Sequence, residues 1–155
     1  MRYRLPAAVL FAALASAAPA HDPKDHFAVS PDEIKWVDAP PSLPPGAKVA
    51  VLEGDPAKEG HFVMRAKLPD GYKIMPHTHP RDERVTVLSG TLQMGVGDTF
   101  DAKATKPMTA GFYGRMGAGV KHFAYAKGET VIQVHGTGPW VVEYVNPADD
   151  PRKKK

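Results

Sequence analysis

The chain has 155 residues, of which 43% are hydrophobic, and this is enough for one ordinary domain with a buried core. Cysteine is absent, so disulfide bonds and thiolate metal sites are excluded, and any metal must be bound by histidine and carboxylate side chains. The formal net charge is only +3, and much of the basic character lies in Arg2, Arg4 and the terminal residues 152–155. A chain body that is near neutral does not predict nucleic-acid binding.

Residues 1–20 have the pattern of a cleavable signal peptide. Arg2 and Arg4 precede an apolar run over residues 5–15, and small residues occupy positions 18 and 20. We therefore expect cleavage near Ala20 and a periplasmic or secreted mature protein. The apolar run is short for a bilayer and no second run follows, so no membrane span is expected, and a retained anchor is the alternative.

Residues 21–45 are expected to form a helical turn followed by an extended arm. Ser30, Pro31 and Glu33 have the spacing of a helix N-terminus, which predicts a short turn through Trp36. Four prolines between residues 40 and 45 then favour extended backbone. At the other end of the chain, residues 147–155 form a basic tail, which we expect to be solvated and disordered rather than bound to a partner.

Residues 46–146 alternate short β-rich runs with turn residues and contain no long amphipathic helix. This pattern predicts an all-β sandwich or small barrel with little helix. Tight turns are expected between consecutive runs, for example at Ser89-Gly90 and Lys127-Gly128. The expected strands are residues 47–54, 61–68, 84–90, 91–97, 112–116, 122–126, 130–136 and 140–146.

The stretch GYKIMPHTHPRDERVTVLSG, residues 71–90, carries a candidate metal site. Alternate residues of a strand share a face, so His77 and His79 can point to the same place. A turn through residues 80–82 could bring Glu83 to the same point. Two imidazoles and a carboxylate suit Fe, Mn, Ni, Cu or Zn, and His122, after a glycine-rich turn, is the best candidate for a fourth ligand.

The same residues resemble the two signature motifs of the cupin superfamily. The glycines at 71 and 90, with His77, His79 and Glu83 between them, match the first motif without a departure. The second motif is matched by Gly111, Gly119 and His122, but Gly117 stands in place of its proline and Ala126 in place of its asparagine. The missing proline predicts a looser turn before His122.

This resemblance implies a single-barrel cupin, a jelly roll of six to eight strands. It also implies that His77, His79, Glu83 and His122 bind one divalent transition metal, and that the chain is similar to cupins that commonly form homodimers. The function expected from it is a small-molecule metalloenzyme, of dioxygenase or isomerase type. A non-catalytic module that binds or senses a metal or small molecule is the alternative, and a purely structural barrel without metal is a third interpretation.

The strand at residues 130–136 leaves a question open about the lining of the site. If Ile132 and Val134 pack outward, Gln133 and His135 face the cavity, whereas otherwise His135 is an exposed residue at a strand end. Further polar candidates near the second motif are Tyr113, Arg115 and Lys121.

Overall fold

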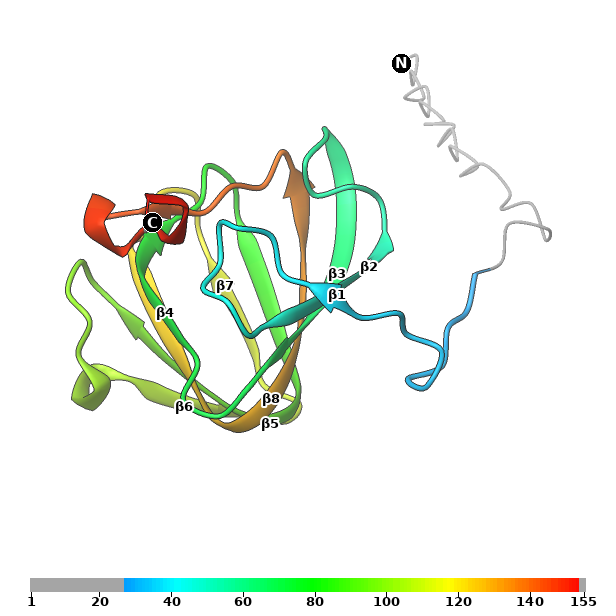
Figure 1. Ribbon diagram of the computed structural model, residues 1–155, viewed down its shortest axis with the longest axis horizontal. Helices are drawn as coiled ribbons and strands as arrows, with labels where there is room; N and C mark the ends of the chain where they lie inside the picture. The colour runs from blue at the N-terminus through cyan, green and yellow to red at the C-terminus, as the bar shows by residue number, and fades with distance from the viewer. Residues whose placement is uncertain (1–26, 154–155) are drawn as a thin grey trace, which may run out of the picture. The chain divides into compact units, whose positions relative to one another are not determined.

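The computed structural model describes residues 27–153, so the predicted signal peptide lies outside the described residues (Figure 1). The described residues 27–33 belong to a different unit from the body that begins at Ile34. In the first unit, the side chain of Glu33 accepts hydrogen bonds from the backbone N–H and the hydroxyl of Ser30, at 2.9 and 2.7 Å. The predicted cap is therefore present, but it closes a single turn and no helix continues through Trp36.

The body is built from strands, with 3-10 turns as its only helical elements within the described residues. The strands are β1 (Val37–Asp38), β2 (Lys48–Glu53), β3 (Gly60–Leu68), β4 (Lys73–Thr78), β5 (Glu83–Val96), β6 (Lys106–Thr109), β7 (Tyr113–Met116), β8 (His122–Gly138) and β9 (Glu143–Tyr144). The 3-10 turns are η1 (Ala102–Ala104), η2 (Pro147–Asp149) and η3 (Pro151–Lys153). This composition confirms the expected all-β class with little helix.

The two longest strands, β5 and β8, hold the antiparallel sheet together. β8 pairs with β3, β4 and β5, and β5 pairs with β6, β7 and β8. Figure 1 shows the strands curling around a common interior, as in a jelly-roll barrel. Successive side chains of β5 point to opposite faces of the sheet. Val85 and Val87 are buried in the interior, while Arg84 and Thr86 on the other face are partly exposed.

The tight turns predicted at Ser89-Gly90 and Lys127-Gly128 are wrong. Each expected pair of runs forms one long strand, β5 or β8, which bends at these positions. The pairing of β5 with β8 shifts register on both sides of Ser89, and Gly90 has a φ of +75°. A Cβ at Gly90 would overlap the carbonyl of Glu129, so the bend needs a glycine although the strand continues.

The proline-rich arm packs on the barrel of its own chain. Tyr72 and Tyr144 donate hydrogen bonds from their hydroxyls to the carbonyls of Pro44 and Ser42, and Leu43 is buried. The tail also differs from the expectation, because Arg152 donates to both carboxylate oxygens of Asp150 and to the carbonyl of Val142. Residues 147–153 are therefore folded. Among the described residues there is no helix long and apolar enough to cross a membrane.

Candidate metal centre

Three histidines from two neighbouring strands meet inside the barrel. His77 lies on β4 opposite His122, the first residue of β8, and their ring centroids are 4.2 Å apart. His79 directly follows β4 and its ring is 4.9 Å from that of His77 and 5.2 Å from that of His122. All three are buried, and one ring nitrogen of each lies within 4.8 Å of those of the other two. As their spacing predicts, the side chains of His77 and His79 point to the same place.

Backbone carbonyls fix the orientation of all three imidazole rings. Nδ1 of His77 lies 2.8 Å from the carbonyl oxygen of Met75, and Nδ1 of His122 lies 2.9 Å from that of Val120. Nδ1 of His79 lies 2.7 Å from the carbonyl oxygen of Val141. A carbonyl can only accept, so each Nδ1 carries the proton and each Nε2 presents a lone pair. This arrangement, with the outer nitrogen held by a carbonyl, is typical of metal-binding histidines.

Glu83 completes a group of four potential ligands. As the first residue of β5, it follows the short bend at residues 80–82 and is only 7% exposed. Its Oε1 lies 3.6 Å from Nε2 of His79, and its Oε2 lies 3.2 Å from Nε2 of His122. The structure thus brings together all four residues that the sequence singled out, and their role as ligands stays a prediction.

The ionisation of three of the four groups, His77, His79 and Glu83, favours metal binding. Burial lowers the pKa of His77 to about 3 and is the main cause of the lowered pKa of His79, so both rings are neutral. Burial alone would raise the pKa of Glu83 and lower that of His122, but their mutual contact reverses both effects. The carboxylate of Glu83 is therefore ionised, and His122 is the imidazole of the site that most readily holds a proton.

The unpaired nitrogens of the site fit a metal. Nε2 of His79 and Nε2 of His122 are buried and have no hydrogen-bond partner among the described residues. Leaving buried polar atoms without a partner is costly, and a cation between these nitrogens and the carboxylate of Glu83 would remove that cost. Three imidazoles and one carboxylate are a common ligand set for a divalent transition metal. The residues present therefore fit the expected ion.

Trp140 supports the site and was not singled out from the sequence. Its indole stacks on the ring of His79, with centroids 4.4 Å apart and planes inclined by 20°. The next residue, Val141, supplies the carbonyl that holds His79. Residues 140–146 have the sequence pattern of an ordinary strand, although only residues 143–144 form one. Nothing in that pattern indicates that Trp140 and Val141 contact a histidine of the site.

The other polar candidates lie away from the four-residue group. Ile132 and Val134 are buried, which directs Gln133 and His135 to the opposite face of β8, where Gln133 accepts a hydrogen bond from Arg65. The interpretation that places Gln133 and His135 in the cavity is therefore wrong. The other three candidates, Tyr113, Arg115 and Lys121, are exposed at the surface. Lys121 pairs with Asp98 and Arg115 with Asp82, while Tyr113 is 54% exposed.

A small interior cavity of about 30 Å³ adjoins the group, which is space for one water-sized molecule. Its lining includes His77, Glu83 and His122. The other lining residues are all apolar: Ile74, Val85, Leu92, Met94, Ala124 and Ile132. The cavity therefore offers no acid or base apart from the expected ligands.

Known structures share this fold at low sequence identity. The polyketide cyclase RemF from Streptomyces resistomycificus is 17% identical with a TM-score of 0.64, over 83% of this chain and 91% of that one. An acetylacetone dioxygenase from Acinetobacter johnsonii is 18% identical with a TM-score of 0.58, over 77% and 78%. An RmlC-like cupin from Shewanella frigidimarina is 17% identical with a TM-score of 0.56, over 73% and 90%. These similarities confirm the jelly-roll fold.

Sequence comparison identifies the family. No curated protein is significantly similar to the chain. The family described as the ChrR cupin-like domain matches residues 24–141, which is most of the sequence and includes all four potential ligands. The chain therefore belongs to the ChrR cupin-like domain family of the cupin superfamily.

Proposed function

We propose that the protein binds one divalent transition metal through His77, His79, Glu83 and His122 and acts as a dioxygenase-type metalloenzyme on a small apolar substrate. The observation that carries this proposal is the pair of buried, unpartnered Nε2 atoms that face an ionised carboxylate. When bound, the metal would supply Lewis-acid and redox chemistry. The residues of the chain would hold it, keep the imidazoles of His77 and His79 neutral and exclude bulk water.

The lining of the interior cavity favours a dioxygenase over an isomerase. Isomerisation moves a proton on the substrate and usually needs a positioned acid or base. Apart from the expected ligands, the cavity has only apolar side chains such as Leu92 and Ile132. An oxygenase that relies on the metal and O2 does not need such a group. The similarity in fold to an acetylacetone dioxygenase agrees with this class.

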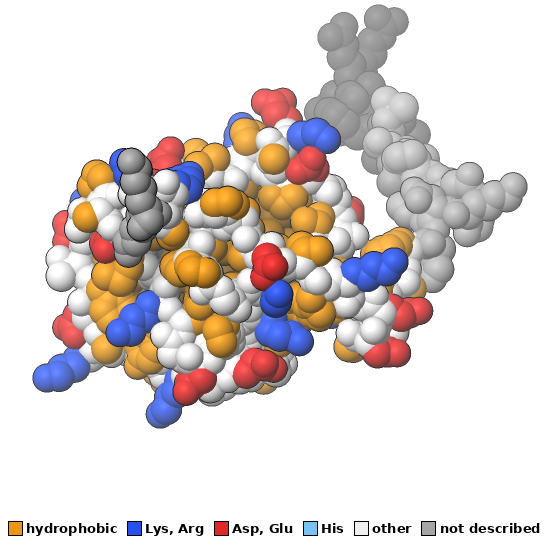
Figure 2. All heavy atoms as spheres, in the orientation of Figure 1, with side chains coloured by type: hydrophobic (Ala, Val, Ile, Leu, Met, Phe, Trp, Pro, Cys, Tyr) orange, Lys and Arg blue, Asp and Glu red, His pale blue; other side chains and the backbone are white. Residues whose placement is uncertain are grey.

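An apolar hollow near His79 supports the proposal that the substrate is a small apolar molecule. This hollow has a volume of about 240 Å³, and Trp140, which stacks on His79, forms part of its wall. Its other lining residues are mostly apolar and include Leu43, Val49, Met64 and Val142. Figure 2 shows hydrophobic side chains gathered over the region of β1, β2 and β3. A small apolar molecule with oxygen substituents matches this surface better than a sugar or a charged metabolite does.

A non-catalytic metal-binding protein is the second candidate function. The observation that favours it is the size of the cavity beside the four residues, about 30 Å³, which leaves no room for an organic substrate in this conformation. We also propose that the protein acts outside the cytosol, since Arg2, Arg4 and the apolar run that follows them have the pattern of an export signal.

Oxygen uptake separates the two functions. The protein would be loaded in turn with Fe, Mn, Ni, Cu and Zn, and O2 consumption measured with acetylacetone as the probe. The dioxygenase proposal predicts substrate-dependent O2 uptake with at least one metal and none with His79→Ala. Metal binding without O2 uptake from acetylacetone or a panel of diphenols and β-dicarbonyls would contradict the dioxygenase and support the non-catalytic candidate.

A further inference from the structure

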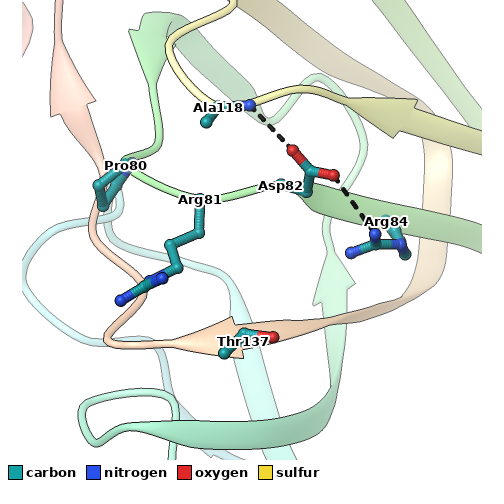
Figure 3. Close-up of a pocket in the computed structure, with 6 residues that line it drawn as sticks. All are labelled: Pro80, Arg81, Asp82, Arg84, Ala118 and Thr137. Carbon is teal, nitrogen blue, oxygen red and sulfur yellow. Dashed lines mark hydrogen bonds and ion pairs between the residues drawn. The ribbon is translucent and has the colours of Figure 1, made fainter.

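A second hollow, of about 330 Å³, lies beside the bend that joins His79 to Glu83. Its lining residues come from that bend, from β5, from the turn before His122 and from β8, and are Pro80, Arg81, Asp82, Arg84, Ala118 and Thr137. Figure 3 shows Asp82 reaching between Ala118 and Arg84, while Arg81 extends away from it, on the side of the strand that carries Thr137. No residue of this lining belongs to the expected ligand set.

One carboxylate, that of Asp82, pairs with two guanidinium groups beside this hollow, and a third arginine, Arg81, belongs to the lining. Oδ2 of Asp82 lies 2.7 Å from Nη1 of Arg115 and 3.3 Å from Nη2 of Arg84, while Oδ1 accepts a hydrogen bond from the backbone N–H of Ala118. Arg81 makes no ion pair within residues 27–153. The carboxylate is thus fully engaged, and the surroundings keep an excess of positive charge.

The strand pairing places a second arginine and a histidine directly opposite Arg84. Its cross-strand partners are Arg115 on β7 and His135 on β8, so one arginine stands between another arginine and a histidine. Burial and then the charge of Arg84 lower the pKa of His135, which reduces this repulsion. Like charges placed directly opposite each other destabilise a sheet, and within residues 27–153 Asp82 is the one acidic side chain that pairs with these two arginines. A bound anion would offset them further.

We propose that this hollow is a binding site for a small oxyanion, either a phosphate or a carboxylate group. Arg81 and Arg84 provide guanidinium donors, whose planar arrangement matches two oxygens of such a group, and Thr137 adds a hydroxyl. The volume of about 330 Å³ suits a small molecule. The site is independent of the metal and goes beyond the proposed function.

Calorimetric titration of the full chain with inorganic phosphate, at constant ionic strength kept with NaCl, tests this site. We expect saturable binding of one phosphate per chain, weakened roughly 10-fold or more in the double variant Arg81→Gln/Arg84→Gln. Arg81→Gln alone should also weaken binding, and it removes no ion pair of the described residues, so its fold is not at risk. Acetate titrated in the same way distinguishes a carboxylate site from a phosphate site by which anion binds more tightly.

Two further variants serve as controls for net charge and for the metal centre. Lys103→Gln/Lys106→Gln removes the same charge near β6, which pairs with the far part of β5, and should leave phosphate binding unchanged. His77→Ala removes an expected metal ligand outside the hollow and should also leave it unchanged. Non-saturable binding of both anions, equal losses in the two double variants, or a loss only in His77→Ala would each overturn the proposal.

Discussion

Asp82 accepts a hydrogen bond of 3.1 Å from the backbone N–H of Ala118, a residue 36 positions away in the chain. This bond connects the bend between His79 and Glu83 to the turn that precedes His122. A second bond, 2.9 Å long, runs from the N–H of Gly119 to the carbonyl of His79. The turn that lacks the proline of the family motif is therefore held by contacts from the other motif.

Removing the Asp82 side chain should weaken metal binding without touching a ligand. Asp82→Ala loses the bond to Ala118 and the contact with Arg115, so the two ligand-bearing segments are less well fixed. We expect metal affinity to fall on the order of 10-fold, as for other supporting groups around metal sites. Asp82→Asn keeps an acceptor for Ala118 and should retain most of the affinity. Unchanged affinity in Asp82→Ala, measured by competition with a chelator, would contradict this role.

Gly117 should tolerate a side chain, unlike Gly90. A Cβ at Gly117 would meet only Val120 and Asp82, at 3.7 and 4.0 Å, and its φ is not left-handed. Gly117→Ala should therefore stabilise the protein by about 0.4–1 kcal/mol, because it restricts the unfolded chain. Gly90→Ala should destabilise it, since φ is +75° and the Cβ would overlap Glu129. Urea unfolding of both variants checks this, and a less stable Gly117→Ala would be inconsistent with the turn described here.

Some features of the fold can be predicted from the sequence alone, whereas others, such as the bend at Gly90, cannot. Alternation in β5 and the spacing of His77 and His79 predict which side chains face the interior, because both depend only on local strand geometry. A glycine at a bend and a glycine at a hairpin look the same in a sequence, so Gly90 wrongly indicates a tight turn. The pairing of β5 with β8 decides between them, and that pairing is not local.

Replacing Trp140 tests the support of His79. Trp140→Ala removes the indole that stacks on the imidazole, and we expect a loss of about 2 kcal/mol in stability together with weaker metal binding. Trp140→Phe keeps an aromatic ring and should behave more like the wild type. Urea unfolding and metal titration of both variants provide the measurement. Equal metal affinity in all three proteins would show that the stacking does not position His79.

The metal-free protein should lose stability as the pH falls below about 6.5, the usual pKa of histidine. In the folded state burial lowers the pKa values of His77, to about 3, and of His79, so the unfolded chain takes up protons first. The decline from these two residues should continue toward pH 3. Urea unfolding at a series of pH values follows it, and His77→Gln should show a shallower decline. Because the raised pKa of His122 acts in the opposite direction, the comparison with the variant decides: a pH dependence in His77→Gln identical to that of the wild type would contradict a neutral, buried His77.

Metal affinity should also decrease with falling pH, chiefly through His122. Glu83 raises the pKa of His122, so a proton competes with the metal there at a higher pH than at the other two rings. Calorimetry in buffers of different ionisation enthalpy measures the protons released on binding. We expect proton release to increase as the pH is lowered from 8 to 6. Binding without any proton release across this range would exclude His122 as a ligand.

The contacts that support His79 could not be predicted from the sequence, because, like the pairing of β5 with β8, they are not local. His79 is held by the carbonyl of Val141 and the ring of Trp140, which are brought to it by the fold and not by any motif. Carbonyls exist at every residue, so the sequence carries no mark of the one that is used. The contacts of His77 with Met75 and of His122 with Val120 are more regular, since each uses the carbonyl two residues earlier.

The metal content of the purified protein is the decisive measurement for the proposed centre. Wild type, His79→Ala and the surface control Lys103→Gln would be expressed together with a mixture of transition metals, purified without chelating resins and measured by elemental mass spectrometry. We predict about one metal ion per chain in the wild type and in Lys103→Gln, and far less in His79→Ala. Equal metal content in wild type and His79→Ala would contradict a metal centre formed by His77, His79, Glu83 and His122.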